Sequence, residues 1–117
     1  MNFQEGAFIY INKPYRMSSF GALAHIRYVV SKRLHVKRVK MGHAGTLDPL
    51  ATGVLILCTG KATKRIEELQ LQSKEYTATL QLGATTPSYD MEHPVDQTYP
   101  TAHITREIIL QTLPQFV

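Results

Sequence analysis

The chain has 117 residues and a single cysteine, Cys58, so no disulfide can form within it. Residues 54–58 are all apolar, which predicts a buried, unreactive thiol rather than a nucleophile. A chain without disulfides suits a reducing compartment, and we expect it to be cytoplasmic. No apolar stretch is long enough to span a bilayer, and residues 1–5 do not resemble a signal peptide. We therefore expect no membrane partner.

Acidic residues are absent from a long segment of the chain: there is no Asp or Glu between Gly6 and Leu47. The same segment carries eight cations, which are Lys13, Arg16, Arg27, Lys32, Arg33, Lys37, Arg38 and Lys40. This asymmetry and a formal net charge of +4 favour an anionic partner such as RNA or DNA. For the cluster at residues 27–40, a solvated basic face stays open as an alternative to nucleic-acid contact.

The apolar pattern predicts strands and helices in alternation, which gives an α+β or α/β domain. We expect strands at 7–11, 54–58 and 74–82, and helices from Ser18 or Ser19 to about 34, at 62–71, and from a Thr105 cap through 113. Segments 35–53 and 83–103 are expected to be loops. Within the first loop, Asp48 would cap a short helix that begins at Pro49. Tyr76 falls on the core-facing side of the strand at 74–82.

The glycine-containing run from Gly42 to Gly53 holds one histidine and one carboxylate. Glycines let a backbone turn sharply and approach a ligand closely. Nearby cations keep a carboxylate ionised, and an ionised Asp48 could act as a nucleophile or base. The alternative for Asp48 is a plain helix cap. His43 is either an ordinary polar loop residue or one that stacks on, or hydrogen-bonds to, a nucleobase.

Other candidate sites are less well supported by the sequence. The five histidines show no ligand pairing at a recognisable spacing, so we expect no metal. The segment from Gly53 to Thr63 lacks the spacing of a phosphate-binding loop, so we expect no nucleotide cofactor.

Tyr76 is more simply explained by packing, although a tyrosine there could also present its ring to a flipped base.

Several short motifs occur in a characteristic order. They are Asn12-Lys13-Pro14 with Met17-Ser18-Ser19, the run Gly42–Gly53, Gly60-Lys61-Ala62-Thr63-Lys64, Lys74-Glu75-Tyr76, and Leu82-Gly83 with Thr86, Ser88 and Asp90. Together they resemble the tRNA pseudouridine synthase B family, and the run Gly42–Gly53 is the most specific of them. The chain departs from the family pattern at Arg16, where glycine is usual, and at Pro87 and His93.

The resemblance implies an α+β catalytic domain with a mixed sheet and flanking helices. It implies conversion of the T-loop uridine of tRNA, uridine-55, to pseudouridine, by base flipping and without a cofactor or metal. Asp48 would be the catalytic aspartate, Tyr76 would stack on the target base, and His43 would support the flipped-out loop. The partner would be the T-arm stem-loop of tRNA. The other residues expected to bind RNA are Gly45, Thr46, Leu47, Lys13, Lys37, Arg38 and Lys40.

The family also carries a strand with a Gly-Thr-Tyr-x-Arg motif, whose arginine pairs with the catalytic aspartate. Nothing in residues 84–117 matches this motif. We therefore expect residues 1–117 to be the N-terminal portion of the catalytic domain, and to be inactive by themselves. Two alternatives remain open: a non-catalytic RNA-binding module on the same scaffold, and a guide-RNA-dependent pseudouridine synthase.

Overall fold

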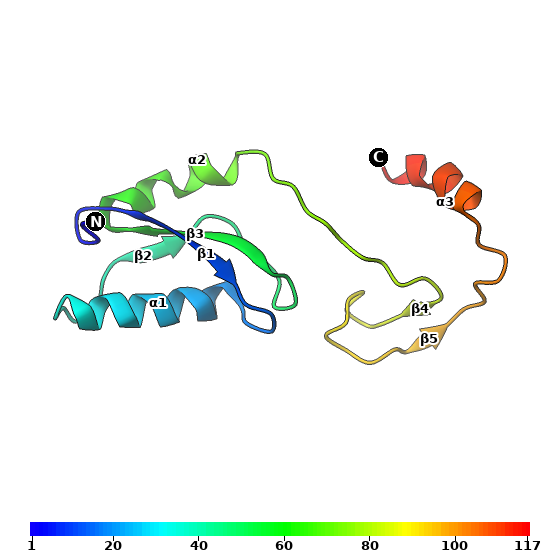
Figure 1. Cartoon of the computed structure of the whole chain (residues 1–117), viewed down its shortest axis with the longest axis horizontal. Coiled ribbons are helices and arrows are strands. Elements are labelled where there is room, and N and C mark those ends of the chain that lie inside the picture. The colour runs from blue at the N-terminus through cyan, green and yellow to red at the C-terminus, as the bar shows by residue number, and fades with distance from the viewer. The chain divides into compact units, whose positions relative to one another are not determined.

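The computed structural model describes residues 1–117, which form two compact units, Met1–Glu75 and Tyr76–Val117. Figure 1 shows the elements of both. Helices and antiparallel strands are combined, which confirms the predicted α+β class. Every strand pair in this chain is antiparallel, so it contains no parallel component of the expected mixed sheet. No helix has both the length and the apolar character needed to cross a membrane.

The first unit is built on a three-stranded sheet with the order β1-β3-β2. The strands are β1 (Phe8–Lys13), β2 (Met41–His43) and β3 (Gly53–Thr59). The central position of β3 agrees with its continuously apolar sequence. Strand β2 lies in the segment that we expected to be a loop. Three residues are too few to show an alternating pattern, and only their pairing with residues 57–59 defines them as a strand.

Helix α1 (Ser19–Arg33) covers one face of this sheet. Its predicted cap is confirmed, since the Ser18 side chain accepts a hydrogen bond from the N–H of Gly21. Ala22 and Leu23 of α1 are buried against Leu55 and Leu57 of β3. The strand register places Ile9 opposite Leu57 and Ile11 opposite Leu55, so β1 adds its own apolar side chains to the same core.

The opposite face of the sheet meets a second helical segment (Figure 1). The segment comprises a 3-10 helix, η1 (Gly60–Arg65), followed by α2 (Ile66–Gln70), where the sequence predicts one helix over 62–71. Gly42 faces α2 so closely that a Cβ there would lie 2.7 Å from Cδ1 of Ile66. Cys58 is opposite Gly42 in the register and is fully buried, as predicted. Burial raises the pKa of the Cys58 thiol, which keeps it protonated and unreactive.

The second unit contains little regular structure. It has two short paired strands, β4 (Ala84–Thr85) and β5 (Gln97–Thr98), then α3 (Arg106–Thr112) and a 3-10 turn, η2 (Leu113–Phe116). The predicted cap of α3 is confirmed, because the Thr105 side chain accepts a hydrogen bond from the N–H of Ile108.

The predicted strand at 74–82 is wrong. Residues 73–81 form no helix or strand, and Tyr76 has 68% of its surface exposed instead of facing a core. An alternating sequence makes a strand only when a neighbouring strand accepts its backbone hydrogen bonds. No other segment of this chain pairs with residues 74–82.

Candidate active site

The loop at residues 44–52 connects β2 to β3, so the glycine-containing run forms the tip of an antiparallel hairpin. Its base is closed where the N–H of Ala44 donates to the carbonyl of Ile56 at 2.8 Å. At the other end, the N–H of Gly53 donates to Oδ1 of Asn12 at 3.1 Å. Asn12 and Lys13 end β1, so this strand end and the loop lie together at one edge of the sheet.

Asp48 lies near the middle of this loop and is exposed. The short helix expected after it is wrong, because the segment makes a single turn in which the N–H of Ala51 donates to the carbonyl of Asp48 at 3.0 Å. The loop joins β3 at Gly53, so too few residues remain for a helix. The one salt bridge of the chain joins Arg65 and Glu68, which leaves Asp48 without a paired cation here.

Ser19 fixes the residue before Asp48. The Ser19 hydroxyl donates to the carbonyl of Leu47 at 2.9 Å and accepts from the N–H of Leu47 at 2.8 Å. A hydroxyl can do both because it has one proton and two lone pairs. The Leu47 side chain also packs against the core. Both the backbone and the side chain of Leu47 are therefore held by the first unit.

Lys13 fixes the residue after Asp48. Its Nζ donates to the carbonyls of Pro14 at 3.0 Å, Met17 at 2.5 Å and Pro49 at 3.2 Å. Lys13 was predicted to contact RNA, and in this structure its side chain is fully buried. All three ammonium protons are already donated to carbonyls. An ammonium without exposed surface or free protons cannot bind a phosphate, so Lys13 acts by positioning the loop.

Sequence reasoning missed the positioning roles of Lys13 and Ser19. A signal was present for Lys13, since a lysine at the end of an apolar strand needs acceptors if it is buried. Ser19 gave no such signal, because Ser18 and Ser19 are equally suited to cap α1. The structure distinguishes them: Ser18 caps the helix, and Ser19 reaches Leu47.

His43 is partly buried and shapes the same loop. Its Nδ1 lies 2.7 Å from the carbonyl oxygen of Gly45. A carbonyl only accepts, so this geometry requires the proton on Nδ1. Gly45 has φ of 99°, a conformation that residues with a side chain rarely adopt. Thr46, next to it, is exposed.

The turn that supplies two of the carbonyls to Lys13 contains Arg16. The φ of Arg16 is 62°, in the left-handed region that glycine enters most easily. The resemblance places glycine at this position. The turn thus keeps a glycine-type backbone although arginine occupies it, and the Arg16 guanidinium lies 5.5 Å from the centroid of the Tyr15 ring.

The remaining predicted site residues fall outside the loop. Lys37, Arg38 and Lys40 are exposed on the segment that leads into β2. Tyr76 begins the second unit. No group of three or more His, Cys, Asp and Glu side chains gathers in the structure. The chemically distinctive feature of the first unit is therefore a carboxylate on a loop held on both sides.

Comparisons with known proteins identify the family of the chain. Residues 32–117 match the family described as TruB family pseudouridylate synthase (N terminal domain). The whole chain is 64% identical to tRNA pseudouridine synthase B of Bacteroides fragilis and 62% identical to that of Bacteroides thetaiotaomicron, covering 50% and 49% of those proteins. A Flavobacterium johnsoniae relative of the same name is 54% identical over 97% of this chain, which covers 50% of that relative.

The chain spans about half the length of these curated relatives. The family match includes the loop that carries Asp48 and the whole of the second unit. The family match and the identity to these relatives agree with the resemblance carried by the motifs. The chain belongs to the TruB family of pseudouridylate synthases.

Proposed function

We propose that this chain contributes the N-terminal portion of the catalytic domain of a tRNA pseudouridine synthase, and that the enzyme converts uridine-55 in the T loop of tRNA to pseudouridine. Two findings support this proposal: membership of the TruB family, and relatives that carry the name tRNA pseudouridine synthase B. We further propose that the protein acts in the cytoplasm, in keeping with its single buried thiol.

The observation that carries the catalytic part of the proposal is the way Asp48 is held. Leu47 before it is fixed by Ser19, and Pro49 after it is fixed by Lys13. A reacting group gains much of its effect from being held close to its productive position before the substrate arrives. Asp48 combines such a position with an exposed carboxylate.

In the proposed reaction, the target uridine leaves the RNA stack and enters the site, which is the general strategy of enzymes that act on a base. Asp48 begins the reaction by attacking or deprotonating the nucleoside. The bond from ribose C1′ to N1 breaks, the uracil turns while it is held, and a bond from C1′ to C5 forms. C5 then loses its proton and N1 gains one, so the product is an isomer of the substrate.

The proposed RNA contacts are those that the family resemblance implies. His43, Gly45, Thr46 and Leu47 would support the displaced nucleotides beside Asp48, and Tyr76 would stack on the target base. Exposed Lys37, Arg38 and Lys40 would contact phosphates of the T-arm stem-loop.

The decisive experiment replaces Asp48 with asparagine in the protein expressed from its complete coding sequence. Asparagine keeps the shape of the side chain but cannot act as a carboxylate base or nucleophile. We expect no measurable pseudouridine in a T-arm stem-loop, together with RNA affinity within about threefold of the parent. Asp96→Asn, a like change in the second unit, is the matched control. Activity near that of the parent in Asp48→Asn would end the catalytic assignment.

The same assay distinguishes the proposed enzyme from a non-catalytic RNA-binding module. A binding module would hold the stem-loop without converting it, in the parent as well as in Asp48→Asn. A second substrate with cytidine in place of the target uridine tests which nucleotide reacts, because it should bind and yield no product.

A further inference from the structure

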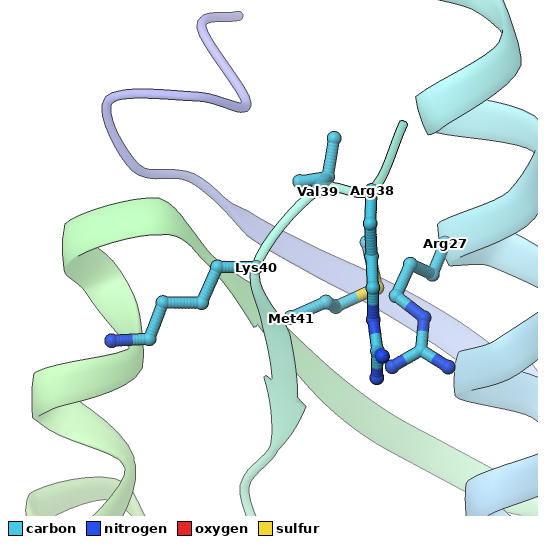
Figure 2. A pocket seen from close by; sticks show the side chains of 5 residues that line it. All are labelled: Arg27, Arg38, Val39, Lys40 and Met41. Carbon is cyan, nitrogen blue, oxygen red and sulfur yellow. The ribbon is translucent and has the colours of Figure 1, made fainter. Parts of the chain in front are cut away.

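Two arginine side chains from different elements line one pocket in the first unit. Arg27 comes from α1 and Arg38 from the segment that enters β2, and Val39, Lys40 and Met41 complete the lining. The pocket has a volume of about 350 Å³. Figure 2 shows the two guanidinium groups directed the same way, while the Lys40 side chain extends in another direction.

The backbone that carries Arg38 is anchored on both sides by one residue of α1. The N–H of Val36 donates to the carbonyl of Ser31 at 3.1 Å, and the N–H of Val39 donates to the Ser31 hydroxyl at 3.0 Å. Ser31 and Val39 are both buried. Ser31 follows Arg27 by four residues and therefore lies beside it on α1. The fold itself thus brings Arg38 to Arg27.

The two charges are not compensated within the chain. No carboxylate lines the pocket, and no Asp or Glu occurs between Gly6 and Leu47. The salt bridge of the chain uses Arg65, not Arg27 or Arg38. Arg27 also lies 5.9 Å from the centroid of the Phe20 ring, within the range of a cation–π contact that orients its guanidinium. Two guanidinium groups repel each other unless an anion lies between them.

We propose that Arg27 and Arg38 form a binding site for a single phosphate group of the RNA backbone. A planar guanidinium presents paired donors that match the oxygens of a phosphate, and two of them can share one phosphodiester. The site rests on the proposed function for the identity of the RNA, but its chemistry is independent of sequence. Within the basic cluster at residues 27–40, it assigns one phosphate to Arg27 and Arg38 together, which a diffuse basic face would not do.

The test measures RNA affinity over a range of salt concentrations, in protein from the complete coding sequence. The probes are a T-arm stem-loop and an unrelated stem-loop of equal length. Arg27→Gln and Arg38→Gln should each weaken binding roughly five- to tenfold near 0.1 M salt, and lower the log–log salt slope by about 0.7 to 0.9. Both probes should respond alike. Circular dichroism melting would confirm that each variant is folded.

The double variant distinguishes a shared phosphate from two separate contacts. If one phosphate lies between both side chains, the double variant should bind little worse than either single variant, because the same contact is already lost. Losses that multiply, with a slope change near twice that of one variant, would overturn the shared site. Arg33→Gln is the charge-matched comparison on α1 outside the pocket, and an equal effect there would mean a diffuse basic face.

Two further outcomes are decisive. If the parent protein binds neither stem-loop, or if inorganic phosphate alone shifts the Arg27 and Arg38 side-chain NMR signals while the variants leave RNA binding unchanged, the assignment to RNA is overturned. The activity of Asp48→Asn tests the proposed reaction, whereas the RNA affinity of the arginine variants tests the phosphate site. The proposed reaction can therefore fail while the phosphate site stands, and the reverse is equally possible.

Discussion

The two units of this chain differ in how many of their apolar side chains are buried. All of the fully buried apolar side chains belong to Met1–Glu75, whereas the single buried residue of Tyr76–Val117 is Thr86. The second unit leaves Leu80, Leu82, Leu110 and Phe116 largely exposed. Apolar burial is the main source of folding free energy, so the first unit can hold a site rigidly by its own contacts. The second unit contributes no buried apolar side chain.

The largest expected effect tests this contrast directly. Leu57→Ala removes a side chain with no exposed surface, and should lower the free energy of unfolding of the first unit by about 2–5 kcal/mol. Ile109→Ala in α3, where the side chain is 40% exposed, should cost less than about 1 kcal/mol. Urea unfolding, followed by circular dichroism, measures both. Similar losses in the two variants would show that the units do not differ as described.

Lys13→Met tests the buried ammonium that supports the loop. Methionine fills similar space but leaves the carbonyls of Pro14, Met17 and Pro49 without a donor. We expect a loss of about 2–3 kcal/mol in the free energy of unfolding, because three partly buried carbonyls lose a charged donor. Pseudouridine formation should fall as well. Lys61→Met, at an exposed position, is the control and should be nearly neutral.

Ser19→Ala tests the other support of the loop. It removes both hydrogen bonds to Leu47, and we expect a loss of about 1 kcal/mol in stability and roughly a tenfold fall in kcat, with KM little changed. Ser19→Thr keeps the hydroxyl and should restore part of kcat. A variant that loses stability but retains the parent kcat would show that Ser19 supports the fold and not the position of Asp48.

Arg16→Gly is expected to act in the opposite direction. Glycine relieves the left-handed backbone at φ of 62°, while it also increases the freedom of the unfolded chain. The balance should stabilise the first unit by about 0.5 kcal/mol, measured as a small rise in Tm. A fall in Tm would indicate that the contact of Arg16 with the Tyr15 ring outweighs the strain.

The smallest effect concerns pH and the second unit. Hydrogen bonds from the Ser88 hydroxyl and the Glu92 N–H hold the pKa of the Asp90 carboxyl below its ordinary value of 3.8. Because the folded pKa is depressed, this contribution is present above pH 3.8 and is lost as the pH falls through the lower folded value. NMR of the Glu92 amide should report the change, and Asp90→Asn should remove it. A titration midpoint above 3.8 would contradict the assignment.

The predictions from sequence succeeded where local chemistry decides the structure. The caps at Ser18 and Thr105 and the buried strand around Leu55 and Leu57 follow from residue types and their immediate neighbours. The resemblance carried by the run Gly42–Gly53 also identified the family.

The failures share a physical cause, which is that distant partners decide the outcome. Residues 74–82 alternate like a strand but find no partner in this chain. Residues 41–43 have no strand pattern and become β2 because residues 57–59 pair with them. Arg27 and Arg38 line one pocket because the N–H of Val39 donates a hydrogen bond to the Ser31 hydroxyl. The spacing of residues in the sequence does not predict this hydrogen bond. The sequence does not reveal that Lys13 is buried, because folding alone brings the acceptors at Met17 and Pro49 to its ammonium group.

The way Lys13 holds its surroundings also bears on how the sequence can drift over evolutionary time. Its three partners are main-chain carbonyls, which every amino acid supplies. Substitutions at 14, 17 or 49 therefore keep the acceptors as long as the backbone path is retained. Position 13 has no such freedom, since only lysine places a compact three-proton donor at the end of a long stem. The geometry around Asp48 thus depends on a few donor side chains while their neighbours remain free to vary.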